Sequence, residues 1–548
     1  MPDRAIPDRP SPVRRSRLGD LVVVLVVTAL TAAGCSSGSG SRRRSATAHT
    51  LAVSEPSSTA TPVAGPGAVT TGSPAVAVPT TAAPPPVITT TTARPAAPAW
   101  AACQNGFECA TLSPPLDYDH PDGRTAKLAL IRLRASGPPT ARIGSVFVNP
   151  GGPGASAVAF ARAARSFIRP AVLARFDVVA FDPRGTGASS PIVCERGPDL
   201  DAYFAVDPTP DDAAERQRLI DVSRRFAEDC AARVGALLGH VDTRTAARDM
   251  DYVRAAIGDD KVSYLGYSYG TLLGAMYADL FPARVRAFVL DGAIDPALDV
   301  EQINRQQAAG FERSFNAFFA DCAAHASCPL QADGDPHTVF DALDARLDTT
   351  PLVVGARTVG SGELFLAVVS ALYRQSDWAS LAAALHAADS AGDGAALLRM
   401  ADEYTQRQPD GSYGSLLSAN AAVNCIDRPW STNVADYDAD AESFKAESPE
   451  FGAALAYGSL ICAFWKVAPV DRQRPLRAAG AAPILVVGTT DDPATPYVWA
   501  QSLASELESG RLLTNHAQGH TSLSAPNACV TDAVTAYVLN LTVPTGEC

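Results

Sequence analysis

The sequence predicts an α/β fold in which helices cover both faces of a mostly parallel sheet. Three observations support this prediction. Short apolar runs bounded by turn residues recur between residues 145 and 514, and helical stretches such as Ala246–Ile257 lie between them. One run leads directly into a glycine-flanked serine, Ser268. An acidic turn and a Gly-His turn follow the last two runs, as expected for functional groups at the carboxyl ends of parallel strands.

Six apolar runs are the predicted strands of this sheet. They alternate with helical stretches, which is typical of βα repeats. In chain order they are Ser145–Val148, Phe176–Phe181, Val262–Leu265, Val285–Leu290, Ile484–Val487 and Leu512–Thr514.

The charge is unevenly distributed along the 548 residues. The whole chain has 45 basic and 58 acidic residues, a net charge of −13. Residues 1–99 carry nine Arg and four acids, which leaves residues 100–548 with 36 basic against 54 acidic residues. The excess of acidic residues in residues 100–548 argues against a nucleic-acid partner, because phosphate binding needs clustered Lys and Arg.

Residues 1–35 have the pattern of a secretory signal. Arg14, Arg15 and Arg17 precede the apolar run Leu21–Ala33, which is too short to span a membrane as a helix. The run ends in Ala-Ala-Gly before Cys35, and this end resembles a bacterial lipobox, in which the cysteine is diacylated. The sequence therefore predicts export, with a lipid anchor at Cys35 or, alternatively, secretion or retention in the cell wall.

Residues 36–99 form a segment of low complexity. Pro, Thr and Ser supply 31 of its 64 residues, and it has no Phe, Trp, Tyr or Cys. Such a composition buries too little apolar area to offset the entropy of ordering, so we expect a disordered linker.

The ten cysteines beyond Cys35 indicate disulfides, because an exported chain with an even number of cysteines usually oxidises them in pairs. Sequence alone leaves the connectivity open, and proximity favours five pairs of neighbours. These are Cys103–Cys109, Cys194–Cys230, Cys322–Cys328, Cys425–Cys462 and Cys529–Cys548.

The strongest motif is Gly266-Tyr267-Ser268-Tyr269-Gly270, which is G-x-S-x-G between a predicted strand and a predicted helix. This is the setting of a nucleophile elbow, a sharp turn that exposes the serine hydroxyl above the sheet. We therefore expect Ser268 to be a nucleophile.

A serine nucleophile needs a base, and the base needs an orienting acid. His520, in a Gly-His turn after the last strand, is the predicted base, with His516 as the alternative. Asp492 is favoured over Asp491 as the acid, because Pro493 indicates a helix start directly after it. The chain order Ser, Asp, His is that of α/β-hydrolases.

The oxyanion hole is expected in the loop after Ser145–Val148, which reads Asn149-Pro150-Gly151-Gly152-Pro153-Gly154. Because glycines leave this backbone almost without side chains, its N–H groups can approach a substrate oxygen. The predicted donors are Gly152 N–H in this loop and Tyr269 N–H, directly after the nucleophile. We interpret the turn Asp182–Gly187 as structural support for this loop.

Five motifs in this order carry a family resemblance that covers roughly residues 100–548. They resemble those of the exported tripeptidyl-aminopeptidase branch of the α/β-hydrolases, which is related to proline iminopeptidases. The resemblance implies a serine exopeptidase that removes short peptides from free N-termini, with Ser268, His520 and Asp492 as its triad. The motifs are Asn149–Gly154, Asp182–Gly187, Gly266–Thr271, Asp492–Pro496 and Gly519–Leu523.

This reading divides the globular part into a hydrolase core, residues 100–294 and 481–548, and an inserted helical cap, residues 295–480. The insertion is rich in Ala, Leu and Asp and lacks clear strand alternation. A cap can exclude water and select substrate. Recognition of a peptide ammonium calls for an acid there, and Asp427 and Glu301 are the candidates.

Two other functions fit the same residues. A carboxylesterase or lipase would use the same triad, because the fold does not specify the leaving group. A non-catalytic surface lipoprotein is the alternative from another class. The pattern predicts no cofactor and no metal site, and the expected partners are peptides with free N-termini and, through Cys35, the cell membrane.

Overall fold

The computed structural model describes residues 95–332, 334–544 and 546–548. The predicted signal segment, Cys35 and almost all of the predicted linker lie outside the described residues. Their proposed roles therefore remain predictions. No described helix is long and apolar enough to cross a membrane.

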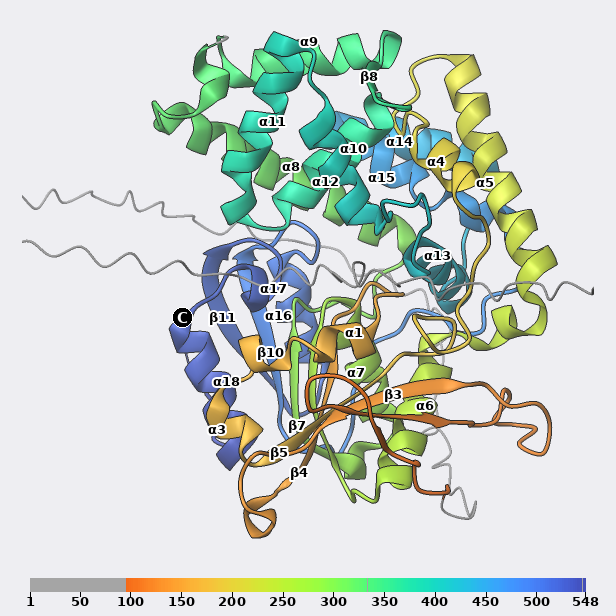
Figure 1. The fold of residues 1–548 in the computed structure, drawn as a ribbon, viewed down its shortest axis with the longest axis vertical. Coiled ribbons are helices and arrows are strands. Elements are labelled where there is room, and N and C mark those ends of the chain that lie inside the picture. Colours follow the sequence, from red (N-terminus) through yellow and green to blue (C-terminus); the bar gives the residue numbers. More distant parts are fainter. Residues whose placement is uncertain (1–94, 333, 545) are drawn as a thin grey trace, which may run out of the picture. The chain divides into compact units, whose positions relative to one another are not determined.

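A nine-stranded sheet forms the centre of the core (Figure 1). Its strand order is β1-β2-β3-β5-β4-β6-β7-β10-β11, and the six strands from β5 to β11 are parallel. The predicted mostly parallel sheet is therefore confirmed. The strands are β1 Ala101–Ala102, β2 Glu108–Leu112, β3 Leu128–Leu133, β4 Gly144–Asn149, β5 Phe176–Phe181, β6 Val262–Tyr267, β7 Val285–Asp291, β10 Ile484–Asp491 and β11 Gly510–Gln518.

The core helices pack on both faces of the sheet, because the side chains of each strand alternate between two apolar clusters. On β4, for example, Val146 and Val148 pack with α1 and α18, whereas Phe147 packs with α6 and α7. The core helices are α1 Ala157–Ala161, α2 Ala164–Phe167, α3 Pro170–Leu173, α6 Thr243–Ile257, α7 Tyr269–Leu280, α16 Tyr497–Glu506, α17 Thr521–Ser524 and α18 Ala528–Asn540.

The chain between β7 and β10 forms a cap, which Figure 1 shows beyond the carboxyl ends of the strands, with α13 between the other cap helices and the sheet. The cap has its own apolar core around Phe311, Phe315 and Leu343. Its elements are α8 Val300–Ala324, α9 Pro336–Thr349, β8 Leu352–Val354, β9 Arg357–Val359, α10 Ser361–Leu372, α11 Trp378–Ala391, α12 Ala395–Thr405, α13 Leu416–Asp427, α14 Val434–Glu447 and α15 Gly452–Tyr457.

Two details of the cap differ from the sequence analysis. A short antiparallel pair, β8 and β9, interrupts the helices. The helices α4 (Pro198–Phe204) and α5 (Ala213–Val234), which the sequence analysis placed in the core, also pack on the cap. Leu219 and Ile220 of α5 lie in one apolar cluster with Tyr437 and Leu460 of the insertion, because an amphipathic helix must bury its apolar face somewhere.

The five disulfides join the predicted neighbours, so the proximity-based pairing is confirmed. Cys425–Cys462 ties α13 to the 3₁₀ helix Leu460–Phe464 within the insertion. Cys194–Cys230 ties the loop after β5 to α5.

The carboxylate of Glu450 lies in an acidic region of the cap beside α9. Burial, together with Asp341, Glu312 and Asp344, raises the pKa of Glu450 to about 7. Because the folded-state pKa exceeds the ordinary value of 4.5, ionising Glu450 destabilises the fold increasingly as the pH rises from 4.5 through 7. We expect Glu450→Gln to stabilise the protein by about 1 kcal/mol at pH 8 and hardly at all at pH 4.5, allowing for partial solvent screening.

Thermal unfolding of both proteins at the two pH values measures this difference. Glu442→Gln, which removes an exposed carboxylate from α14, is the matched control and should leave the melting temperature unchanged. Equal stabilisation by Glu450→Gln at both pH values would contradict the explanation from ionisation.

Candidate active site

Ser268 occupies the turn between β6 and α7 with a positive φ of 55°. This strained conformation is possible because glycines lie on both sides of it. A Cβ at Gly266 would lie 2.5 Å from Gly270 O, and one at Gly270 would lie 2.9 Å from Asn149 O. The backbone N–H of Ser268 donates to Asp291 O at the end of β7, 2.9 Å away. The turn thus has the geometry of a nucleophile elbow.

His520 and Asp492 are in direct contact. His520 Nδ1 lies 2.9 Å from Asp492 Oδ1 and 3.0 Å from Oδ2, and the two residues are 7% and 1% exposed. A carboxylate at Nδ1 keeps the proton on that nitrogen and leaves Nε2 as the proton acceptor. The structure therefore brings together the predicted base and acid in the arrangement that a serine nucleophile requires.

Asp492 is fixed by its own loop. Its Oδ1 accepts hydrogen bonds from Ala494 N at 2.9 Å and Thr495 N at 2.8 Å. Its Oδ2 accepts from Thr495 Oγ1 at 2.9 Å and from Thr521 N at 3.0 Å. These donors stabilise the ionised carboxylate and fix its orientation toward the imidazole.

The turn after β6 and the loop after β11 both contact the end of β7. Ser268 is bonded to Asp291 O, and the next residue, Gly292, lies against the His520 loop. A Cβ at Gly292 would lie 3.3 Å from His520 Cε1 and 3.0 Å from Thr495 Oγ1. A side chain at Gly292 would therefore collide with Thr521 Cγ2, at 2.6 Å, and crowd the loop that carries His520.

The alternative acid and base lie elsewhere. The side chain of Asp491 is exposed, and its backbone oxygen accepts from Gly519 N at 3.2 Å. His516 is also exposed and pairs with Glu547 at 2.9 Å. Neither side chain approaches the buried pair His520 and Asp492.

The glycine loop after β4 lies against the nucleophile turn. A Cβ on Gly151 would lie 2.8 Å from Ser268 Cβ and 2.9 Å from Tyr269 N. Gly151 N donates to the buried Asn149 Oδ1 at 2.9 Å, which fixes the start of the loop. The two predicted donors, Gly152 and Tyr269, therefore belong to backbone segments in contact with each other, as an oxyanion hole requires.

Replacing Gly151 with alanine should displace this loop, because its φ is +99° and the new methyl group would meet the backbone of the nucleophile turn. We expect kcat to fall by about 10²- to 10³-fold, the loss that accompanies removal of one oxyanion donor. Steady-state kinetics on the best substrate measures the loss.

Gly144→Ala, at the start of β4, is the matched control. A Cβ there would have Asp259 Oδ2 at 3.9 Å as its nearest neighbour, so its kcat should equal that of the wild type. An unchanged kcat in Gly151→Ala would mean that this loop supplies no oxyanion donor.

The turn Asp182–Gly187 supports the glycine loop from the side. Asp182 Oδ1 accepts from Ser156 Oγ at 2.8 Å and Val158 N at 2.9 Å, at the start of α1. Its Oδ2 accepts from Ala188 N at 2.9 Å. These contacts join the loops after β4 and β5, which agrees with the structural interpretation of this turn.

Three further residues near the site were not predicted from the sequence. Thr495 bonds Asp492 and lies 3.3 Å from His520 Nδ1. Asp291 accepts hydrogen bonds from Ser522, and burial raises its pKa to about 6. Tyr373 of the cap accepts a hydrogen bond from His520 N at 2.9 Å, and its ring meets the imidazole edge-on. Only Thr495 had a local signal, its spacing of three residues from Asp492.

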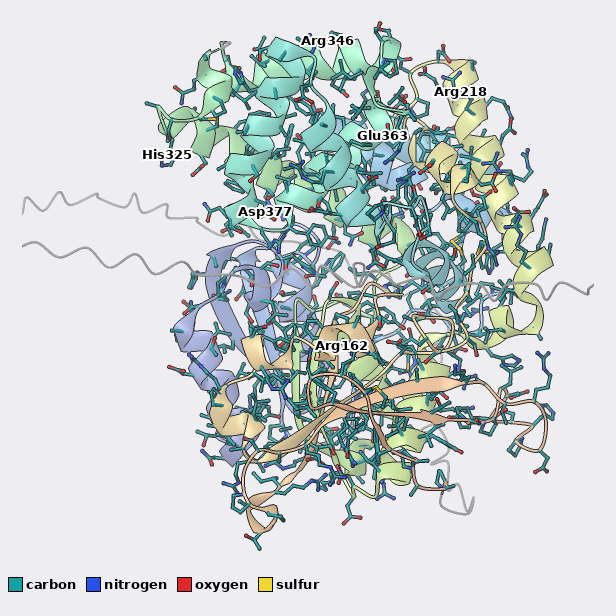
Figure 2. All side chains as sticks on the ribbon, viewed as in Figure 1. Arg162, Arg218, His325, Arg346, Glu363 and Asp377 are labelled. Atoms are coloured by element: carbon teal, nitrogen blue, oxygen red, sulfur yellow. A yellow bond between two sulfur atoms is a disulfide. The ribbon has the colours of Figure 1, made fainter. Side chains whose placement is uncertain are left out.

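Two cavities adjoin the glycine loop, and both are lined by Gly152, Tyr373 and Tyr404. The larger, about 700 Å³, is here called the charged cavity because Arg374, Asp377, Arg399 and Glu403 line it. Figure 2 shows Asp377 at the edge of the cap that faces the core. The smaller, about 370 Å³, is here called the aromatic cavity, and its lining includes Tyr269, Trp430 and Trp499.

The two predicted ammonium ligands, Asp427 and Glu301, do not belong to the described lining of the aromatic or the charged cavity. The buried carboxylate of Asp427 accepts from Thr243 N at 2.8 Å and from Thr243 Oγ1 at 2.6 Å, and this hydroxyl also contacts Tyr269 OH. Burial raises the pKa of Asp427 to about 7. Glu301 is exposed in the first turn of α8 and pairs with Arg305 at 2.9 Å. Asp427 thus fixes Thr243, whose hydroxyl contacts Tyr269 OH, and Glu301 lies on the surface.

Comparisons with known proteins agree with this site. A family model described as alpha/beta hydrolase fold matches residues 144–523. Serine protease Hip1 of Mycobacterium tuberculosis is 38% identical over 477 residues, 81% of this chain and 89% of that protein. Carboxylesterase B of the same organism is 38% identical over 448 residues, 80% and 85% of the two chains. Tripeptidyl aminopeptidase of Streptomyces coelicolor is 34% identical over 444 residues, 79% and 81%.

Proposed function

This chain belongs to the α/β-hydrolase-fold family, and we propose that it is a serine peptidase that releases short peptides, tripeptides in the first instance, from free N-termini. Ser268 attacks the scissile carbonyl while His520 takes its proton, and Asp492 stabilises the imidazolium. Gly152 and Tyr269 N–H groups stabilise the tetrahedral oxyanion. His520 then protonates the leaving amine, and water hydrolyses the acyl-enzyme.

The lining of the aromatic cavity carries the proposal of a peptide substrate. This cavity lies beside Tyr269 and contains amide side chains as well as aromatic rings. Most of the wall is apolar, and the amide groups set into it provide partners for the N–H and C=O groups of a peptide, which a lipid acyl chain would leave unpaired. At about 370 Å³ the cavity lies at the small end of ligand sites, which suits a short acyl segment.

The amide side chains of this cavity present oxygen atoms. Asn304, Gln307 and Asn424 each donate their NH₂ group to the protein, to Ser459 Oγ at 2.8 Å, Ala494 O at 2.8 Å and Asn420 Oδ1 at 2.9 Å. Because these bonds occupy the NH₂ groups, we propose the side-chain oxygens as the acceptors for peptide N–H groups or an ammonium. No carboxylate belongs to the described lining of this cavity, so these neutral oxygens are our candidates for the substrate amine.

The relatives support a peptidase and keep one alternative open. Two of them are named as a serine protease and a tripeptidyl aminopeptidase, and a third is named as a carboxylesterase. The same triad can cleave esters, so a carboxylesterase is the second candidate function.

A substrate panel separates the two functions. Tripeptidyl anilides with a free N-terminus, their N-acetylated forms and short-chain p-nitrophenyl esters are compared by kcat/KM, with Ser268→Ala as the blank. We expect the free-amine anilides to be cleaved and the acetylated forms to be at least ten times poorer. Ester hydrolysis without anilide hydrolysis would overturn the peptidase assignment.

We also propose that the enzyme acts outside the cytoplasm, anchored by diacylated Cys35. The predicted signal pattern and the five disulfides of the described residues support this location. Labelling with a fatty-acid analogue in wild-type and Cys35→Ser cells tests the anchor. Equal labelling of both proteins would exclude it.

A further inference from the structure

Arg428 is a buried cation that follows α13 directly. It is 8% exposed, and its Nε is buried without a hydrogen-bond partner. Among the described residues, no carboxylate oxygen lies within ion-pairing distance of the guanidinium. Burial accordingly lowers the pKa of Arg428. A buried charge without a partner is costly, so such an arginine is poised to accept an anionic ligand.

The neighbouring acids do not neutralise Arg428 directly. Both carboxylate oxygens of Asp427 are engaged by Thr243. Asp295 and Asp471 act on the guanidinium only through longer-range electrostatics. On the side of Asp471, Arg428 borders a void of about 30 Å³, which has room for little more than one water molecule. A ligand larger than a water molecule therefore has room beside Arg428 only on the other side.

That other side is the aromatic cavity. Arg428 lines it together with Tyr269, Asn424 and Trp430, and it is the one charged side chain in the described lining. Because Gly152 and Tyr269, the two predicted oxyanion donors, both line this cavity, a substrate that acylates Ser268 would extend its acyl segment into the cavity that contains Arg428. A planar guanidinium pairs with a carboxylate through two parallel hydrogen bonds, which makes it selective for that group.

We propose that Arg428 forms an anion subsite that binds the carboxylate of an aspartyl or glutamyl side chain in the acyl segment of the substrate. This subsite rests on the proposed peptidase function and specifies its substrate class. A site built around a buried charge discriminates strongly against a neutral analogue, because the neutral group leaves the charge unpaired. The enzyme should therefore release acidic short peptides in preference to neutral ones.

The test uses tripeptidyl anilides that differ only by Glu or Gln at each of the three positions. For the wild type we expect kcat/KM to favour Glu over Gln by about tenfold or more at one position, the value of a charge-assisted hydrogen bond. In Arg428→Met the Glu/Gln ratio should fall to about one, and in Arg428→Lys it should lie between. Circular dichroism and thermal unfolding verify that each variant is folded.

Arg472→Met is the matched control, because Arg472 is exposed, borders the small void instead of the aromatic cavity, and carries the same charge. Its Glu/Gln ratio should equal that of the wild type. A wild-type ratio near one at every position, or a ratio that survives in Arg428→Met, would overturn the subsite.

Calorimetric binding to Ser268→Ala separates this subsite from the proposed catalysis. Free Glu- and Gln-containing tripeptides are titrated into Ser268→Ala with and without Arg428→Met. Tighter binding of the Glu peptide that depends on Arg428 supports the subsite even if no anilide is cleaved. Equal binding of both peptides refutes it, and in that case cleavage of neutral anilides would still support the peptidase function.

Discussion

Ser268→Ala should lose all labelling by a fluorophosphonate and lower kcat on the best substrate by about 10⁴- to 10⁶-fold. The reason is the elbow geometry, in which a positive φ and two obligatory glycines present this one hydroxyl above the sheet. Removing it leaves the oxyanion donors and the aromatic cavity in place, so a small residual rate is expected. Gel fluorescence after probe labelling and steady-state kinetics measure the two effects.

Ser380→Ala is the control for this experiment. Ser380 is an exposed serine that lines the charged cavity, so the probe can reach its hydroxyl. It lies outside the nucleophile turn, so its hydroxyl is not activated. Labelling and kcat should match the wild type. Labelling that persists in Ser268→Ala would show that another residue is the nucleophile, and it would remove the basis of the proposed mechanism.

The parallel part of the sheet was predictable because its strands are buried on both faces. Such strands appear in the sequence as nearly continuous apolar runs, and Phe176–Phe181, in which only Asp177 is polar, has the same bounds in the structure. The antiparallel strands β1, β2 and β3 gave no such signal. Every residue of β2 before Leu112 is at least partly exposed, so its composition resembles that of a loop.

The pairing of the cysteines was predictable because each disulfide joins neighbours along the chain. The bridges close segments of 6 to 37 residues, and no pairing between distant segments competes with them in the described structure. Local chain closure therefore determines the whole pattern.

The ammonium ligands could not be predicted, because that assignment depends on where a side chain points. The carboxylate of Asp427 accepts hydrogen bonds from Thr243, which lies 184 residues earlier in the chain. Arg428, its neighbour, borders the aromatic cavity instead. The backbone oxygen of Tyr373 likewise accepts from His520 N, a residue far along the chain. Such contacts between the cap and the core follow from tertiary packing and have no local pattern.

Asp492→Asn should reduce kcat by about 10⁴-fold, the second large effect that the structure predicts. An asparagine keeps the shape of the side chain but can donate to His520 Nδ1, which would stabilise the tautomer with its proton on Nε2. That tautomer cannot accept the proton of Ser268. The neutral amide also provides no compensation for the imidazolium that forms during attack. Single-turnover and steady-state kinetics at several pH values measure the loss.

Asp491→Asn is the matched control, because it makes the same chemical change one residue earlier. The Asp491 side chain is exposed, and the contact of this residue with the histidine loop uses its backbone oxygen, which the substitution keeps. Its kcat should therefore stay within about threefold of the wild type, as is usual for a surface change away from the reacting groups. If Asp491→Asn instead showed the larger loss, the contact between Asp492 and His520 would not be the one that operates in catalysis. The two neighbouring carboxylates thus provide an internal comparison in which burial and hydrogen bonding, at constant residue type, decide which one supports the base.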